Sequence, residues 1–209
     1  GIKLIGSGEE NCFIDGGSLA GVIRFEYCTP CSEIINSTTL ITGFTIQNGN
    51  EHGGPPYNDH GGGMFLYFAS PTLTGVTFSG NTGYNGGGMY LTDSNPTLTG
   101  VTFSNNYATY GGGMHLSSSN PTLTGVTFSA NDTGGEGGGM YLSSSNPTLT
   151  GVTFSGNTAL IKGGGMRMYG SSATLTNVTF SGNTATNGGG GMHLQNSSST
   201  LTNVTISGN

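Results

Sequence analysis

Charged side chains are scarce in this chain. Asp, Glu, Lys and Arg make up only 7% of its 209 residues, against about 25% in a typical globular domain. There are only four Lys and Arg residues and the formal net charge is −6. Binding to phosphates needs clustered positive side chains, so this balance argues against a nucleic acid partner.

Long apolar runs are missing as well. The longest, Met64–Ala69, is far shorter than the ~20 residues that a membrane-spanning helix requires. The sequence therefore predicts no membrane span in this chain.

Cysteine is limited to three residues, of which Cys28 and Cys31 form one Cys-x-x-Cys motif. A structural zinc site needs four ligands, and no second motif of this kind is present. We expect a local disulfide between Cys28 and Cys31, with metal binding and free thiols as alternatives. Cys12 would then be free or would pair with one of the two. No cofactor and no metal site is expected.

Glycine is abundant, with 41 residues, and it follows a strict period. The motif Gly-Gly-Gly-Met occurs six times, with its methionines 25 or 26 residues apart, at Met64, Met89, Met114, Met140, Met166 and Met192. A second motif, Thr-Leu-Thr-Gly/Asn-Val-Thr-Phe/Ile-Ser-x-Asn, follows each copy. A repeat of this length indicates units that stack on one another to bury a common core.

The repeat unit predicts strands. Apolar and polar residues alternate in it with period two, and Thr, Val, Phe and Tyr dominate. We expect three short strands in each unit, for example Gly88–Leu91, Thr97–Thr99 and Val101–Phe103. If each strand pairs in parallel with its copy in the next unit, the result is an all-β fold, a single-stranded parallel β-helix with coils of 25–26 residues. Residues 1–60 would form irregular N-terminal coils of the same domain, and residues 61–209 the regular ones.

Two further columns fit such coils. Gly75 and its equivalents become Asn177 and Asn203 in the last repeats, and both residue types tolerate the left-handed conformation of a sharp corner. The Asn of the Phe-x-x-Asn motif would form a structural ladder from coil to coil. This ladder contains Asn81, Asn106, Asn131, Asn157, Asn183 and Asn209. Alternation places the Met, Leu, Val and Phe columns in the core.

The paired motifs resemble a known family. Gly-Gly-Gly-Met with Phe-Ser-Gly-Asn is similar to the paired GGA[I/L/V] and FxxN repeats of polymorphic outer-membrane-protein-like β-helices, over about residues 40–209. In this chain Met stands where that family prefers Ile or Ala. The resemblance implies a right-handed β-helix and a secreted or surface-displayed protein. It also implies adhesion or a structural stalk, so we expect an extracellular or cell-surface location.

Threonine columns suggest an alternative function. Outward Thr-x-Thr pairs on a flat face resemble those of insect ice-binding proteins, although Thr is also the natural outward residue of an uncharged strand. A possible ice-binding face would consist of Thr72, Thr74, Thr97, Thr99, Thr122, Thr124, Thr148, Thr150, Thr174, Thr176, Thr200 and Thr202.

A more varied column lies on the first strand of each unit. It mixes aromatic, His and Arg side chains, which could bind a glycan or a partner protein, or could simply stabilise the sheet by stacking. We name this column the stripe; it consists of Phe65, Tyr90, His115, Tyr141, Arg167 and His193.

Catalysis is not expected. Polysaccharide-degrading enzymes need clustered carboxylates, or a metal and a base, and the ten acidic residues are scattered over turns and the N-terminal part. A site around Asp59 and His60, with Glu51 and His52 nearby in the insertion Gln47–His60, is possible, with a solvated loop as the plainer interpretation. Polysaccharide binding or degradation remains a second alternative function.

Self-association is a further expectation. The regular motif continues to Asn209 without a charged or Pro-rich guard, and an open solenoid end exposes unpaired backbone groups. Either more chain follows, or the end pairs head-to-tail with another copy and builds a fibre.

Overall fold

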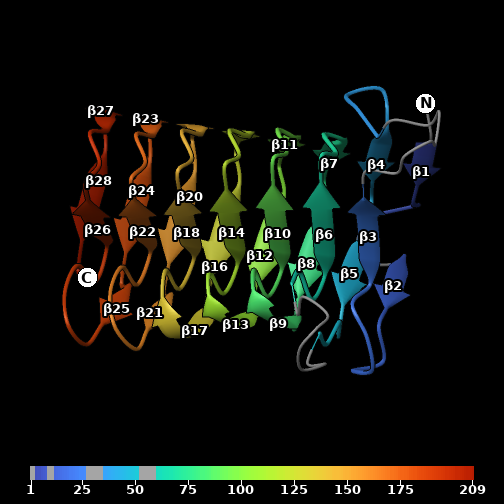
Figure 1. Ribbon diagram of the computed structural model, residues 1–209, viewed down its shortest axis with the longest axis horizontal. Helices are drawn as coiled ribbons and strands as arrows, with labels where there is room; N and C mark the ends of the chain where they lie inside the picture. The colour runs from blue at the N-terminus through green and yellow to red at the C-terminus, as the bar shows by residue number, and fades with distance from the viewer. Residues whose placement is uncertain (1–2, 9–11, 27–34, 52–59) are drawn as a thin grey trace.

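The computed structural model describes residues 3–8, 12–26, 35–51 and 60–209. Within these ranges the chain forms strands and turns but no helix. Its strands lie side by side along one long axis, with the two ends of the chain at opposite ends of the stack (Figure 1). Every strand pair is parallel, so the predicted β-helix of stacked coils is the fold of this chain.

Sheets A and B contain the two Thr-rich strands of each coil. Sheet A consists of β1 (Lys3–Ile5), β4 (Leu40–Thr42), β7 (Thr72–Thr74), β11 (Thr97–Thr99), β15 (Thr122–Thr124), β19 (Thr148–Thr150), β23 (Thr174–Thr176) and β27 (Thr200–Thr202). Sheet B consists of β2 (Phe13–Asp15), β5 (Thr45–Gln47), β8 (Thr77–Ser79), β12 (Thr102–Ser104), β16 (Thr127–Ser129), β20 (Thr153–Ser155), β24 (Thr179–Ser181) and β28 (Thr205–Ser207).

Sheet C contains the strands that follow the Gly-Gly-Gly motif. It consists of β3 (Ile23–Glu26), β6 (Met64–Tyr67), β10 (Met89–Thr92), β14 (Met114–Ser117), β18 (Met140–Ser143), β22 (Met166–Tyr169) and β26 (Met192–Gln195). These three sheets hold the three predicted strands of each coil.

A fourth strand in each inner coil was not predicted. It forms sheet D, which consists of β9 (Thr82–Asn85), β13 (Tyr107–Tyr110), β17 (Asp132–Glu136), β21 (Thr158–Ala159) and β25 (Thr184–Ala185). These segments vary from coil to coil and contain Gly, Asp and Asn, which are poor strand formers. Their backbones are held by the regular coils on both sides, so pairing here does not depend on local propensity.

Equivalent residues lie directly opposite one another in neighbouring coils. Leu98, for example, pairs in register with Leu73 and Leu123. The inward Met, Leu, Val and Phe columns are fully buried through the inner coils. The Phe column stacks nearly face to face, with ring centroids 4.9 Å apart between Phe103 and Phe128. The predicted core is therefore confirmed.

The corner and ladder positions behave as predicted. The corner residue has a positive φ in each regular coil, from 52° at Gly75 to 62° at Gly151, and Asn177 shares this conformation at 55°. The ladder Asn side chains are buried from Asn81 to Asn183, whereas Asn209 in the last coil is exposed. Each buried one bonds to the next coil, as where Asn131 Nδ2 donates to Asn157 Oδ1 at 2.9 Å and to the carbonyl of Phe103 in the preceding coil at 2.9 Å. Bonding to backbone and side chain together fixes the coil register.

The predicted disulfide between Cys28 and Cys31 lies outside the described residues. Cys12 is half-buried, and its Sγ lies 3.0 Å from both the amide nitrogen and Oγ of Ser7. Those hydrogen bonds lower the pKa of the Cys12 thiol. In the described part of the chain, no helix has the length and apolar character needed to cross a membrane.

Candidate ligand-binding groove

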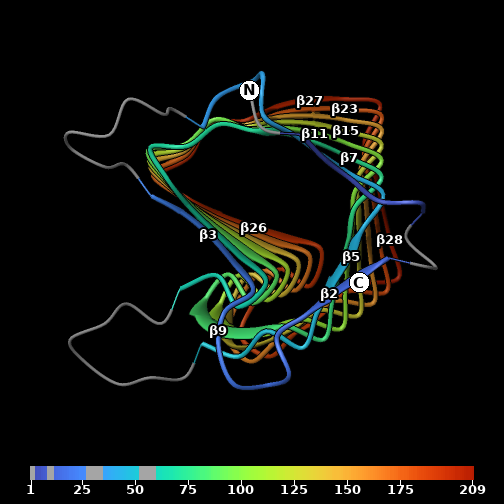
Figure 2. The same cartoon turned by 90° about the vertical axis from the view of Figure 1, so that its right-hand side faces the viewer.

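The three glycines of each motif bring sheets C and D close together. Gly86 has a φ of +64°, which favours glycine. A Cβ atom on Gly87 would lie 2.3 Å from the carbonyl oxygen of Tyr107, and one on Gly88 would lie 2.6 Å from that of Gly113. Any larger residue would push the coils apart. Viewed along the axis, the strands of sheet C cut inward across the outline of the coil. Sheet D lies on the side of sheet C that is away from sheets A and B (Figure 2).

The stripe lies on the side of sheet C that faces away from the core. Its rings form a continuous column, with centroids 5.6 Å apart for Phe65 and Tyr90, 5.1 Å for Tyr90 and His115, and 4.7 Å for His115 and Tyr141. Phe65 and His115 are only 5% and 8% exposed. These values are lower than expected for an outward column on an open face, because a second column covers it.

That second column, which we name the wall, comes from the residue directly before each of the first five Gly-Gly-Gly motifs; before the sixth this position is Gly188. Its members pair in register at the edge of sheet D. They are His60, Asn85, Tyr110, Glu136 and Lys162. The sequence analysis missed this column, although its signal was available: it is a position of variable, chemistry-bearing residues beside an invariant motif.

Wall and stripe residues face each other with a constant offset of one coil. The ring of His60 lies 4.4 Å from that of Tyr90, and the ring of Tyr110 lies 5.5 Å from that of Tyr141. Glu136 and Arg167 make the same pairing through an ion pair. The two columns thus form opposite sides of a groove that runs along the solenoid, and the three described histidines, His60, His115 and His193, all belong to it.

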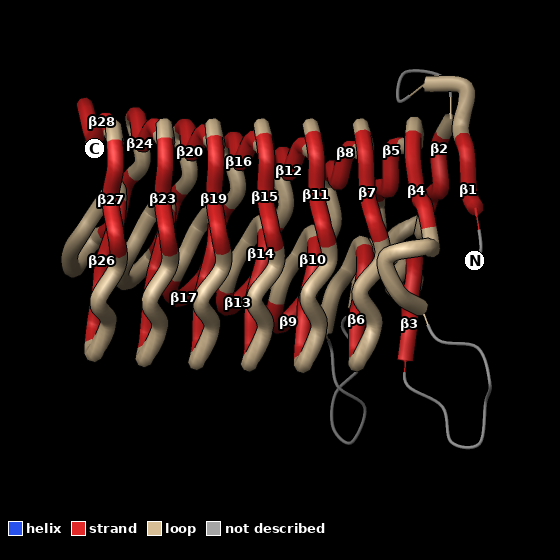
Figure 3. Tube along the Cα trace, turned by 90° about the horizontal axis from the view of Figure 1, so that it is seen from above, coloured by secondary structure: helices blue, strands red, loops and turns tan. Residues whose placement is uncertain are grey.

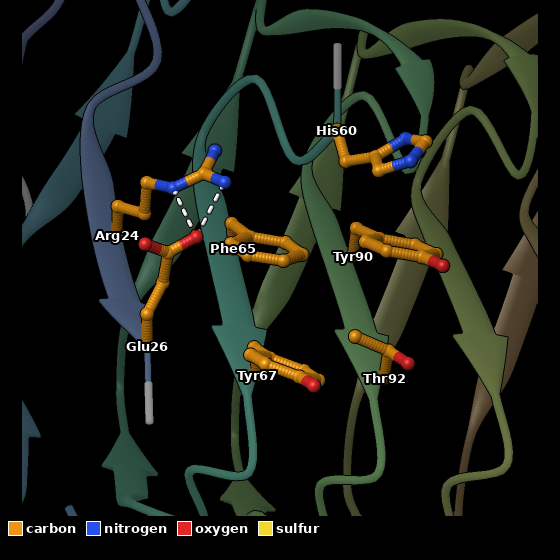
Figure 4. A pocket seen from close by; sticks show the side chains of 7 residues that line it. All are labelled: Arg24, Glu26, His60, Phe65, Tyr67, Tyr90 and Thr92. Atoms are coloured by element: carbon orange, nitrogen blue, oxygen red, sulfur yellow. Dashed lines mark hydrogen bonds and ion pairs between the residues drawn. The ribbon is translucent and has the colours of Figure 1, made fainter. Parts of the chain in front are cut away.

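A first pocket lies at the N-terminal end of the groove (Figure 4). It has a volume of about 390 Å³ and is lined by Arg24, Glu26, His60, Phe65, Tyr67, Tyr90 and Thr92. The guanidinium of Arg24 lies 4.3 Å from the centre of the Phe65 ring and pairs with Glu26, Nε donating to Oε1 at 2.7 Å. The two charged side chains among the described residues that line this pocket therefore neutralise each other.

A second pocket lies in the middle of the groove. It has a volume of about 320 Å³ and is lined by Tyr84, Asn85, Tyr90, Tyr110, His115, Ser117, Tyr141 and Ser143. Among the described residues, no charged side chain lines it. Asn85 Oδ1 and His115 Nδ1 are buried and have no hydrogen-bond partner among the described residues. Such atoms are costly unless a ligand or water satisfies them.

The far end of the groove is ionic. Arg167 is 3% exposed, and its Nε donates to Glu136 Oε2 at 2.9 Å. Its Nη atoms donate to Gln195 Oε1 and to the carbonyl of Met168. Because these bonds occupy the guanidinium, Arg167 ties the stripe to the wall and does not offer a free cation to a ligand.

Burial keeps the side chains in the middle of the groove neutral. It lowers the pKa of His115 to about 3, with the nearby His60 adding to the effect. It also raises the pKa of the Tyr90 and Tyr141 phenols. At neutral pH the middle of the groove therefore offers aromatic faces, hydroxyls, an amide and an uncharged imidazole.

The Thr-x-Thr columns lie on a separate face, formed by sheet A (Figure 3). The pairs stack in register from coil to coil, Thr97 opposite Thr72 and Thr122, and most of the twelve are exposed. From β7 to β27 the strands of this face contain only Thr and Leu. The face is thus flat, uncharged and periodic.

Metal-ligating side chains do not gather in the described part of the chain. It contains no cluster of three or more His, Cys, Asp and Glu side chains placed to hold a metal ion. Two residues of the insertion Gln47–His60 that were considered for a site lie apart in role. Glu51 accepts a hydrogen bond from the amide of Gly21 at 3.2 Å, and His60 belongs to the groove. Residues 52–59, with His52 and Asp59, lie outside the described residues.

Comparison with known proteins places this architecture in a family. No curated protein and no solved structure matches the chain significantly. The family model for the right-handed β-helix region matches residues 27–209, which is most of the chain. The chain therefore belongs to the right-handed β-helix family.

Proposed function

We propose that this chain is an adhesive β-solenoid of an extracellular or cell-surface protein, and that the groove between stripe and wall binds an extended carbohydrate. The observation that carries the proposal is the concentration of varied side chains on two facing columns, while the core, corner and ladder columns scarcely change. Repetition alone would copy these two columns as faithfully as the others. The resemblance to polymorphic outer-membrane-protein-like repeats supports the surface role.

Carbohydrate fits the chemistry of the groove. Sugar rings stack on aromatic side chains and exchange hydrogen bonds through their hydroxyls, and the groove offers both kinds of group. A linked sugar chain can follow the groove because the stripe repeats once per coil, with a strand spacing of about 4.8 Å. The two pockets share Tyr90, so one chain can occupy both.

The experiment compares two tyrosines of the same strand, β13. Tyr110 lines the groove, whereas Tyr107 is 43% exposed and lines a different pocket with Asp132 and Leu160. On an array of neutral and acidic oligosaccharides, wild type and Tyr107→Ala should bind the same glycans. Tyr110→Ala should bind them about tenfold more weakly, as expected for the loss of one stacking ring. Equal binding by both variants, or no glycan bound by wild type, would overturn the proposal.

A second candidate function rests on the Thr face of sheet A. Its hydroxyls and methyls form a regular array, repeating at about 4.8 Å between coils and about 6.7 Å along each strand. Such an array could order water against ice. Ice shaping and thermal hysteresis should then be present in wild type and lost in Thr99→Lys/Thr124→Lys, which alters two neighbouring coils. Unaltered ice crystals with wild type would rule this candidate out.

Head-to-tail assembly stays a prediction. Sedimentation velocity over a concentration series, with electron microscopy of the same samples, tests it. Long fibres one solenoid wide would support assembly, and discrete rods at all concentrations would contradict it.

A further inference from the structure

The middle of the groove contains a pair of polar atoms that no other coil repeats. Wall and stripe residues face each other with an offset of one coil, and this offset makes Asn85 the wall neighbour of His115. Both line the second pocket. The wall–stripe pairs on either side of it make ring contacts instead, His60 with Tyr90 and Tyr110 with Tyr141. Elsewhere in the described structure Asn50 Oδ1 and His193 Nδ1 are also buried without partners, but only Asn85 and His115 place two such atoms on facing wall and stripe residues.

The position of the Asn85 amide is held by its neighbour. Its Nδ2 lies 3.1 Å from Nδ1 of His60 and donates a hydrogen bond to it. Turning the amide over would exchange this bond for one from a protonated His60 Nδ1 to Asn85 Oδ1, so in either orientation one polar group of the amide is left for a ligand. His115 is fixed by its own neighbours, because its ring is packed between those of Tyr90 and Tyr141. The unpaired amide group and the imidazole are thus preorganised in one pocket.

The surroundings select against charge. The residues that line the pocket are tyrosine, asparagine, histidine and serine. Arg24 and Arg167, on either side along the groove, are already paired with Glu26 and Glu136. A carboxylate or sulfate in this pocket would lose its hydration without gaining a cation. A neutral ring with hydroxyl groups loses less and can satisfy both unpaired atoms.

We propose that the second pocket is a subsite for an uncharged pyranose sugar, held by stacking on the groove tyrosines and by hydroxyl hydrogen bonds to Asn85 Oδ1 and the His115 imidazole. A sugar hydroxyl donates to Asn85 Oδ1. The imidazole accepts from or donates to a second hydroxyl through whichever ring nitrogen its tautomer presents. This inference rests on the proposed carbohydrate function and names the ligand class at its centre.

The test uses variants that the repeat itself shows to be compatible with the fold. Phe65 occupies the stripe position of His115 in another coil, so His115→Phe keeps a ring and removes the nitrogens. Asn85→Ala removes the carbonyl. Tyr107→Ala, on the outer face, is the control. Circular dichroism and urea unfolding confirm that each variant is folded before binding is measured.

Calorimetry with the neutral oligosaccharide that binds best on the array gives the readout. His115→Phe and Asn85→Ala should each weaken binding about tenfold, the loss expected for one hydrogen bond in a buried site. A series of single-deoxy analogues adds a readout that a structural role would not move. For wild type, one deoxy analogue should bind about tenfold more weakly than the parent sugar, because it lacks the hydroxyl that contacts His115. For His115→Phe, the same analogue and the parent sugar should bind equally well.

The outcomes separate the two proposals. Binding of acidic glycans alone, with Tyr110→Ala weakened, would overturn the neutral subsite and leave the carbohydrate groove standing. Neutral binding that His115→Phe and Asn85→Ala do not weaken would likewise overturn this subsite alone. Binding of no glycan, or of a peptide ligand instead, would overturn both proposals.

Discussion

Glu136 Oε2 accepts a hydrogen bond from Arg167 Nε at 2.9 Å, and the two residues belong to different sheets of neighbouring coils, β17 and β22. The pair occupies the place where the preceding coil has the ring contact of Tyr110 and Tyr141. An ion pair and an aromatic pair can therefore close the groove at the same structural position.

Removing one partner of this pair should be more harmful than replacing both. Glu136→Leu leaves the nearly buried Arg167 without its counter-charge, so the free energy of unfolding should fall by about 3 kcal/mol. Glu136→Tyr/Arg167→Tyr copies the aromatic pair of the neighbouring coil and should lie within about 1 kcal/mol of wild type. Urea unfolding followed by circular dichroism measures both. A double variant as unstable as the single one would contradict this account.

A second Asn column is exposed, and each of its side chains accepts a hydrogen bond from a backbone amide of the next coil; it consists of Asn95, Asn120 and Asn146. The buried Asn ladder should contribute more to stability than this exposed one. Asn131 bonds to Asn157 and Phe103 and accepts bonds from Asn106, all in a buried environment. Asn131→Ala leaves these groups unsatisfied, so we expect a loss of about 3 kcal/mol or more. Asn120→Ala, in an exposed ladder where water can replace the amide, should cost less than about 1 kcal/mol. Thermal unfolding of the two variants measures both losses of stability, and equal losses would contradict this prediction.

The stacked Phe column should tolerate a branched aliphatic residue better than a truncation. Phe128 is fully buried, between Phe103 and Phe154, with ring centroids 4.9 and 4.8 Å away. Phe128→Ala should cost about 3–5 kcal/mol because it opens a cavity. Phe128→Ile should cost clearly less, since Ile46 and Ile206 occupy the same column in register. The midpoints of denaturant unfolding of the two variants measure this difference, and equal midpoints would contradict the prediction.

Acid should destabilise the chain through His115. Its pKa is about 3 in the folded chain, against 6.5 for the free group. Between these values the unfolded chain binds more protons, so stability is lost as pH falls through this window. His193, whose pKa burial also lowers, acts in the same direction. His115→Phe should flatten the fall in unfolding free energy between about pH 6.5 and pH 5, above the range where most carboxyl groups titrate.

The measurement is a set of urea titrations at several pH values in that interval. Tyr107→Ala serves as the control, because it changes an exposed ring and no histidine. An unchanged pH slope in His115→Phe would show that this imidazole is not the group responsible.

The regular part of the fold could be predicted because each column repeats. Met89, Leu98 and Phe103 recur at one spacing, and that spacing has one simple solution, parallel stacking of equivalent strands. The fourth strand could not be predicted in this way, since β9 and β17 share little sequence and follow the backbone of their neighbours. The stripe could be predicted from the alternation of residues along each strand, whereas the wall that covers it could not. That cover depends on how tightly Gly87 and Gly88 allow the chain to fold back, which is a tertiary property.

The offset between wall and stripe makes the groove modular. Each coil contributes one residue to either side, and each of these residues faces a residue from an adjacent coil. Duplicating or deleting one whole coil would therefore lengthen or shorten the binding surface by one unit, and at the junction it would also create a wall–stripe combination that existed nowhere before. Unequal recombination between the near-identical Gly-Gly-Gly-Met segments could thus diversify recognition while leaving the cross-section and the core unchanged.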